Sequence, residues 1–497
     1  MVEQRHLVGV GIGQGQQRHD RDDRSVSNGV RRLQHLYADE VVTADRQMVM
    51  VGFLQAQNCT NLPASWRHPD SRTDFLSADF YREIACVLER GKFHLAFFDD
   101  RLAMPDRYGG DHAHTVEHGI RCVKLDPIVT LMTMGMATTR LGLGATYSTT
   151  YYEPFHVART FATIDLVTGG RAAWNVVTSL NDGEAMNMGR DEVMEHDLRY
   201  DRADEFMEVV LGHWDTWEDD SLIVDKASGR FADASKVHRL DHAGEFFRSR
   251  GPFTVPRSPQ GHPVVIQAGQ SGRGRQFAGR WGEVIFTTSP NIAFGKKGYA
   301  ELKDEAARNG RDPSSMLLCN LVTPVSAATL MEAEDKMAVI QQLPLEIDQL
   351  SLLAEALNFD FAAKGLDEEL TDAELASFTG IHTIRDRVLG LSHKKNPTVR
   401  EFMQLSHRGR PDDAIVGGPR EVANRLEELF SEQVCDGFVV GATHVPGGYA
   451  DFVEHVVPEL QRRGLYHTDY TGATLRDNLG LPRPEVGAWR AAEATSA

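Results

Sequence analysis

Short apolar runs alternate with longer segments of helical period from residue 47 onward. The runs are nearly continuous in apolar residues rather than alternating with polar ones, which is typical of parallel strands buried on both faces. Eight such runs occur, at 48–54, 92–98, 141–147, 172–178, 263–269, 283–288, 316–324 and 436–441. Most are followed by a helical segment, so they predict an α/β fold, a (β/α)8 TIM barrel with insertions. A doubly wound parallel sheet is the alternative; eight units without a complete GxGxxG motif favour the barrel.

The segments between the runs carry the signals of amphipathic helices. In residues 77–91, Ser77 is a candidate N-cap, Gly91 is a candidate stop, and the apolar residues between them fall on one face. Residues 200–214 again place their apolar side chains on one stripe. Both segments are therefore predicted to be helices.

The first 46 residues differ from the rest of the chain. They are rich in Gly, Gln, Arg and Asp and have no sustained apolar period. A segment of this kind cannot bury enough apolar surface to order itself. We therefore expect residues 1–46 to be a disordered extension or to lie upstream of the true start, for which Met48 and Met50 are candidates.

Two later stretches interrupt the barrel rhythm. Residues 218–262 are polar and contain three prolines, which argue against regular structure, and residues 344–412 are longer and partly helical. Both are predicted to be insertions within a barrel that spans residues 47–480, before a C-terminal tail at 481–497. Long excursions at the carboxyl ends of barrel strands usually build the substrate pocket.

Charge and composition narrow the function classes. Among 497 residues, 53 are Lys or Arg and 71 are Asp or Glu, so the formal net charge is −18. This excess of negative charge disfavours nucleic acids and anionic membrane surfaces as partners. We find no apolar run of about 18 residues, the length that a membrane span needs. The five cysteines are scattered and form no CxxC pair, which favours a reducing, cytoplasmic location.

Two catalytic motifs are incomplete. GQSGRG at 269–274 lacks the final glycine of a nucleophile elbow. His112, His114 and His118 form an HxHxxxH cluster in a polar, glycine-rich segment. Metal binding there needs imidazoles oriented by further partners, and no carboxylate-bearing partner segment is evident. We therefore expect a solvated loop and predict no metal site.

More informative polar residues follow the predicted strands. Asp100 comes directly after the second run, Thr146 closes the third, and Ser271 follows the fifth at the start of a helical segment. A hydroxyl beside free backbone N–H groups at a helix N-terminus binds anions such as a cofactor phosphate. His196 and Tyr200, four residues apart, would share one helix face and could hold the same phosphate.

Several long stretches resemble one enzyme family: WRHPDSRTDFLS, LGLGATYSTTYYEPFHVARTFATIDLVTGGR, WNVVTSLND, EHDLRYDRADEF, VPRSPQGHPVVIQAG and TLRDNLGL. Residues 47–480 resemble the bacterial luciferase-like flavin monooxygenases, in the branch of dibenzothiophene-sulfone monooxygenase and nitrilotriacetate monooxygenase component A. The resemblance implies a barrel that uses reduced FMN and O2, with the FMN supplied by a separate NAD(P)H:FMN reductase. It also implies that the flavin is held by Asp100, Thr146, His196, Tyr200 and Ser271. We further expect a homodimer or homotetramer.

The expected substrate pocket departs from the sulfone enzymes. Asn61 stands where their segment carries a histidine, Ala356 replaces a second histidine, and Arg101 replaces a glycine. No acid–base residue is assigned. The pocket candidates are Asn61, Trp66, Phe97, Arg101 and Phe286, with Phe359 and Phe361 as further aromatic candidates.

One arginine beside several aromatic rings favours a small apolar aromatic, halogenated or organosulfur substrate, because a polycarboxylate would need several converging cations. An aminopolycarboxylate monooxygenase is an alternative. Two further alternatives for the same barrel are a deazaflavin-dependent oxidoreductase and a flavin-binding protein without catalytic activity.

Overall fold

The structure is a computed structural model that describes residues 46–269 and 272–492. The chain divides into two units, Met1–Arg46 and Gln47–Ala497. The predicted disordered extension, apart from Arg46, lies outside the described residues. Every helix and strand among the described residues belongs to the second unit.

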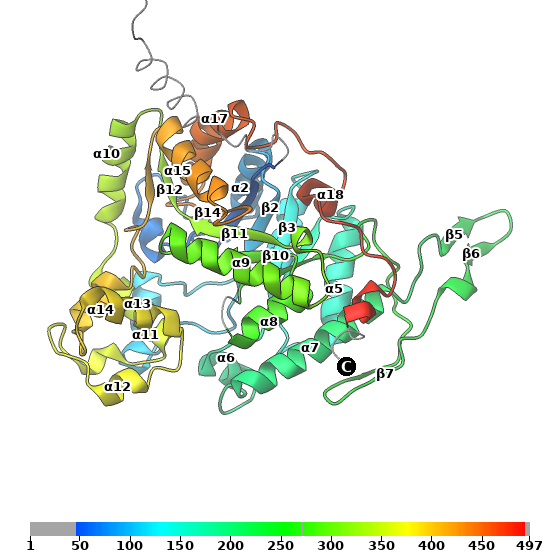
Figure 1. Ribbon diagram of the computed structural model, residues 1–497, viewed down its shortest axis with the longest axis horizontal. Coiled ribbons are helices and arrows are strands. Elements are labelled where there is room, and N and C mark those ends of the chain that lie inside the picture. Colours follow the sequence, from blue (N-terminus) through cyan, green and yellow to red (C-terminus); the bar gives the residue numbers. More distant parts are fainter. Residues whose placement is uncertain (1–45, 270–271, 493–497) are drawn as a thin grey trace, which may run out of the picture. The chain divides into compact units, whose positions relative to one another are not determined.

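Eight parallel strands close into a barrel (Figure 1). Their order around the barrel follows the chain, and the last strand pairs with the first, Phe53 lying in register with Gly441. The longest ladder joins the third and fourth strands over six residue pairs. The strands are β1 (Val49–Leu54), β2 (Leu95–Phe98), β3 (Gly142–Ser148), β4 (Ala172–Val177), β9 (Val264–Gln267), β10 (Val284–Thr287), β11 (Leu317–Val322) and β14 (Gly437–Gly441). Seven of them fall within the apolar runs, and β3 extends one residue beyond its run, to Ser148, so the predicted (β/α)8 fold is confirmed.

Helices follow the strands and cover the barrel. Ser77 caps the first of the large helices by accepting a hydrogen bond from the backbone N–H of Asp79, and Phe80, Ile84 and Leu88 are buried on its inner face, as predicted. The helices next to the barrel are α2 (Ala78–Arg90), α4 (Pro127–Gly135), α5 (Pro154–Val167), α6 (Asp182–Asn187), α7 (His196–Trp214), α8 (Gly272–Trp281), α9 (Ile292–Arg308), α15 (Pro419–Ser431), α16 (Gly447–Asp451) and α17 (Val457–Arg462). None of the helices among the described residues is both long and apolar enough to cross a membrane.

The barrel interior is filled by its own apolar cluster, separate from the layer between strands and helices. Val51, Leu95, Ile266 and Val284 are among its buried members. Near the amino ends of the strands the cluster is completed by Leu475 and Leu479 of α18 (Leu475–Leu479), which follows every barrel strand in the chain. Because α18 covers the amino end, we look for the functional site at the carboxyl end of the barrel.

The segment 218–262 contains two short antiparallel hairpins, which the sequence did not predict. They are β5 (Leu222–Asp225) with β6 (Arg230–Ala232), and β7 (His242–Ala243) with β8 (Arg248–Ser249). Pro252, Pro256 and Pro259 all follow β8, so they do not interrupt either ladder. The segment connects α7 to β9 and therefore approaches a strand at its amino end, away from the expected pocket.

The segment 344–412 emerges after β11 and the connecting elements β12 (Pro324–Ser326) and α10 (Leu330–Gln341). It forms a helical cluster around buried Leu353, Phe378 and Phe402. Phe359 and Phe361 also pack in this cluster, with their ring centroids 4.9 Å apart. They are therefore core residues of the insertion and do not line a pocket together with Phe97.

The remaining α-helices and β-strands of the described residues are α3 (Ala113–His118), α11 (Glu346–Leu357), α12 (Asp372–Ala376), α13 (His382–Ser392), α14 (Val399–Leu405) and β13 (Ile415–Gly417).

Candidate active site

Aromatic side chains form the floor of the site at the carboxyl end of the barrel interior. Phe97 of β2 is buried and contacts Phe286 of β10 edge to face, with ring centroids 4.8 Å apart. Phe53 of β1 stacks on the other side of Phe97 at 5.8 Å. The structure thus brings together two of the predicted pocket residues, Phe97 and Phe286, and adds Phe53. This floor offers an apolar surface that excludes water.

The next two strands contribute a polar pair to the same level. Thr146 of β3 donates a hydrogen bond to the backbone oxygen of Phe98 (3.1 Å) and accepts one from the amide of Asn175 on β4 (2.8 Å). The Oδ1 atom of Asn175 is buried and has no hydrogen-bond partner among the described residues. Sequence reasoning named Thr146 but missed Asn175, although a polar residue inside the apolar run AAWNVVT is a visible signal.

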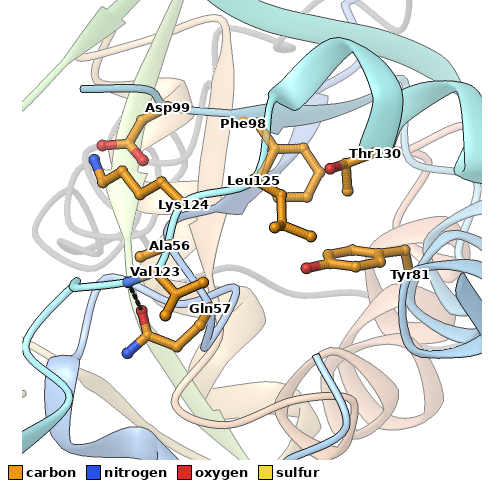
Figure 2. Close-up of a pocket in the computed structure, with 9 residues that line it drawn as sticks. All are labelled: Ala56, Gln57, Tyr81, Phe98, Asp99, Val123, Lys124, Leu125 and Thr130. Atoms are coloured by element: carbon orange, nitrogen blue, oxygen red, sulfur yellow. Dashed lines mark hydrogen bonds between the residues drawn. The ribbon is translucent and has the colours of Figure 1, made fainter. Parts of the chain in front are cut away.

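Asp99 and Asp100 lie where β2 ends. Asp99 accepts a hydrogen bond from Gln55, which follows β1. Burial raises the pKa of Asp100 to about 7, the Lys124 ammonium opposes this shift, and the neighbouring Asp99 adds to it. Figure 2 shows Lys124 directed toward Asp99 in a small pocket beside the strand ends, where the side chain of Gln57 accepts a hydrogen bond from the backbone N–H of Val123 (3.4 Å). Asp100 therefore takes up or releases a proton near neutral pH.

His196, Tyr200 and the first turn of α8 form a corner beside β4. The rings of His196 and Tyr200 lie 5.2 Å apart on the first turns of α7, as the spacing predicted. A Cβ atom on Gly274 would lie 2.8 Å from the Tyr200 hydroxyl, so glycine is what allows α8 to come this close. Burial raises the pKa of Tyr200, which keeps its hydroxyl protonated. Gln270 and Ser271 lie outside the described residues, so the position of Ser271 stays a prediction.

Ion pairs hold this corner in place. Arg273 of α8 binds Asp201 at 2.6 Å and Asp204 at 2.8 Å, both on α7. The indole N–H of Trp281 donates to the same Asp204 at 2.6 Å. The two helices that carry the corner are therefore fixed to one another. The Tyr200 hydroxyl lies next to the first turn of α8, where the backbone N–H groups of a helix have no intrahelical partner.

Arg101 is not the main cation of the site, contrary to the sequence expectation. Its guanidinium binds Glu355 of α11 at 2.7 Å, and the charges of Arg121, Lys124 and Arg408 also act on Glu355. Glu355 and Arg408 are far from Arg101 in the sequence, so no local pattern predicted that these charges meet. A second pocket lies between Arg101, residues 181–184 and Glu355.

Asn61 and Trp66, two further predicted pocket residues, do not lie together. The Oδ1 atom of Asn61 lies 3.0 Å from where a Cβ on Gly441 would stand, at the carboxyl end of β14. Trp66 is 40% exposed and donates a hydrogen bond to the backbone oxygen of His118 (3.0 Å) at the end of α3. Asn61 therefore sits above the barrel mouth, whereas Trp66 covers α3 and does not join Phe97 and Phe286.

The predicted solvated histidine loop forms the short helix α3. His114, Glu117 and His118 bring their ligand atoms within 4.8 Å of one another, as do His68, Asp70 and His444. Glu117 is a carboxylate that sequence reasoning overlooked. The rings of His68 and His444 are stacked, with centroids 3.9 Å apart and an interplanar angle of 12°, so their lone pairs lie in nearly parallel planes and do not converge on one ion. The absence of a metal site stays a prediction from the sequence.

The barrel and its polar mouth define a family. Residues 77–437 match the family model described as luciferase-like monooxygenase, and the chain belongs to this family. The protein is therefore an enzyme, a flavin-dependent monooxygenase.

Relatives at full length support this assignment. The chain is 43% identical to dibenzothiophene-sulfone monooxygenase of Rhodococcus erythropolis over 455 residues, which cover 90% of this chain and 99% of that protein. It is 38% identical to nitrilotriacetate monooxygenase component A of Aminobacter aminovorans, covering 84% and 94%. Among solved structures, DmoA from Hyphomicrobium sulfonivorans superimposes with a TM-score of 0.81 at 31% identity, covering 90% of this chain and 96% of that one. The predicted family and branch are confirmed.

Proposed function

We propose that the protein is the oxygenase component of a two-component system that uses reduced FMN and O2. A separate NAD(P)H:FMN reductase supplies the reduced flavin. The observation that carries this proposal is the approach of the Tyr200 hydroxyl to the first turn of α8. Such a corner offers a phosphate both a hydroxyl donor and backbone N–H groups. FMN carries one terminal phosphate, which this corner suits.

The remaining residues fit the rest of a flavin. Asp100 and the Thr146–Asn175 pair lie at the ends of three neighbouring strands, where the polar edge of an isoalloxazine ring needs partners. The unpartnered Oδ1 of Asn175 is an acceptor available for a ring N–H. When bound, reduced FMN supplies the electrons that activate O2 for transfer of one oxygen atom. The protein binds and orients the flavin and substrate, while Phe53, Phe97 and Phe286 exclude water from the floor.

For the substrate, we propose a small compound with an apolar aromatic, halogenated or organosulfur body. Its apolar part would lie against the Phe97–Phe286 pair, because these two rings belong to the apolar cluster that fills the barrel. An aminopolycarboxylate is the second candidate, which the cations around Glu355 favour. We further propose a cytoplasmic homodimer or homotetramer.

The test is a substrate screen with an added flavin reductase, NADH, FMN and ¹⁸O2, read by product mass. We expect a product carrying one ¹⁸O atom. Product formed with a reduced deazaflavin, and without ¹⁸O, would contradict the proposed oxygenase. In the same assay, nitrilotriacetate oxidised faster than every aromatic compound would refute the proposed substrate class.

A further inference from the structure

Three arginines converge where the insertion meets the barrel mouth. Arg101 follows β2, Arg121 follows α3, and Arg408 follows α14. Glu355 of α11 is the carboxylate among them, and it binds Arg101 at 2.7 Å. The Arg121 guanidinium donates to the backbone oxygen of Asn61 at 3.2 Å. No hydrogen bond or ion pair of the Arg408 guanidinium occurs among the described residues.

Around Arg408 the positive charge exceeds what the neighbouring carboxylate compensates. The guanidinium of Arg408 experiences two like charges, Arg121 and Arg101, and one opposite charge, Glu355. Burial, followed by these two like charges, lowers the pKa of Arg408 to about 10. The Nε atoms of Arg121 and Arg408 are both buried and lack an acceptor in the part of the chain that the structure describes. Burying cationic donors without partners is costly, so an anion from outside the chain would stabilise the arrangement.

Two further carboxylates act on the other arginines of the cluster but not on Arg408. The charge of Asp99, which also accepts a hydrogen bond from Gln55, acts on Arg101 and Arg121, and the charge of Glu184 acts on Arg101. Glu184 accepts hydrogen bonds from the backbone N–H of Leu102 (3.2 Å) and from Ser179 (3.4 Å) on the other side of Arg101. Lys124 adds a further cation. Neither Asp99 nor Glu184 is among the charges that shift Arg408.

The cluster adjoins the aromatic floor through a short chain of contacts. Arg121 binds Asn61, and the Asn61 side chain lies against Gly441, where any larger residue would meet its Oδ1 atom at 3.0 Å. Gly441 is in register with Phe53, and Phe53 stacks on Phe97. An acidic group held by the arginines would therefore place the attached carbon skeleton over the floor.

We propose that Arg121 and Arg408 bind a carboxylate of the substrate, so that the enzyme oxygenates organic acids whose apolar part lies on the Phe53–Phe97–Phe286 floor. This inference rests on the proposed function and narrows its substrate class. A planar guanidinium donates two parallel N–H hydrogen bonds to a carboxylate. A neutral ester has no negative charge and therefore gains much less from the same donors. The acidic group then determines specificity, and the floor accepts the part that is oxygenated.

The test compares (benzylthio)acetic acid with its methyl ester by calorimetric titration of the flavin-free full-length protein. We expect the acid to bind at least about tenfold more tightly than the ester, because one charge-assisted hydrogen bond contributes that much. Arg408→Gln should abolish this preference, Arg408→Lys should restore part of it, and Arg410→Gln, two residues away and paired with Asp412, should leave it unchanged. Equal binding of acid and ester by the unaltered protein would overturn the proposal without any variant.

Reduced-FMN binding is measured anaerobically on the same proteins, which separates the two proposals. We expect Arg408→Gln to bind FMN as the unaltered protein does, and circular dichroism to show the same fold. If Arg408→Gln does not fold, Arg121→Gln takes its place. Normal FMN binding and ¹⁸O incorporation into neutral compounds, without preference for the acid, would contradict the carboxylate site alone. Absence of FMN binding would contradict the proposed function and leave the acid-over-ester preference as an independent result.

Discussion

Arg476 and Glu283 form a bidentate ion pair at the amino end of the barrel, with Nη1 2.6 Å from Oε1 and Nη2 2.8 Å from Oε2. Arg476 belongs to α18, whereas Glu283 immediately precedes β10 and also accepts a hydrogen bond from the backbone N–H of Val265 at 2.9 Å. Burial would raise the pKa of Glu283, but the charge and hydrogen bonds of Arg476 hold it below its ordinary value. The pair thus attaches α18 to β9 and β10.

Arg476→Met should destabilise the fold by about 3–5 kcal/mol, because it leaves a buried carboxylate without its partner. The measurement is the free energy of unfolding in urea. The double variant Arg476→Met/Glu283→Gln should recover part of the loss, since the uncompensated charge is then gone. A loss below about 1 kcal/mol, as for exposed pairs, would contradict this account.

The barrel was predictable because each of its strands is buried on both faces and therefore appears in the sequence as a nearly continuous apolar run. The positions of Asp100 and Thr146 were predictable too, since parallel strands end at one edge of a barrel. Arg121 and Arg408 were not, because nothing local relates residues nearly 300 positions apart in sequence. The hairpin β5–β6 was missed because its strands are exposed and only four and three residues long.

Asp100→Asn should change how stability depends on pH. The pKa of Asp100 is raised to about 7 in the folded protein, against an ordinary value of 3.8. Between these values the folded state binds more protons, so the contribution of this group to stability is largest below about pH 4 and falls as pH rises to about 7. The gain in Tm of Asp100→Asn over the unaltered protein should therefore be larger at pH 8 than at pH 5. Asp304→Asn, an exposed change on α9, is the control, and an equal gain at both pH values would refute the raised pKa.

Tyr200→Phe combined with Ser271→Ala should weaken reduced-FMN binding. Each hydroxyl offers one hydrogen bond to a charged phosphate, and such bonds contribute roughly 1.5–3 kcal/mol, or about tenfold or more in affinity per residue. The measurement is an anaerobic flavin titration. Tyr470→Phe is the matched control, because its hydroxyl donates to the backbone oxygen of Phe93 (2.8 Å), just before β2, and should not affect flavin. Unchanged binding in the double variant would remove the phosphate assignment.

Deleting residues 1–46 should leave both Tm and flavin affinity unchanged. That segment has no apolar period with which to pack on a barrel. Thermal melting and the same flavin titration, on truncated and full-length protein side by side, check this expectation. A clear fall in Tm of the truncated protein would show instead that the segment is structural.

Phe286→Leu should weaken the use of aromatic substrates more than that of aliphatic ones. Phe286 meets Phe97 edge to face at 4.8 Å, and such aromatic pairs contribute about 0.5–1.5 kcal/mol beyond the area they bury. An aromatic substrate on the same floor would lose a contact of this kind, whereas an aliphatic one loses little when leucine replaces phenylalanine. In the coupled assay, kcat/KM for (benzylthio)acetic acid should fall by about threefold to tenfold relative to (butylthio)acetic acid. Phe402→Leu makes the same substitution in the core of the insertion, where it should lower Tm without changing that ratio. An unchanged ratio in Phe286→Leu would mean that the substrate does not lie on the floor.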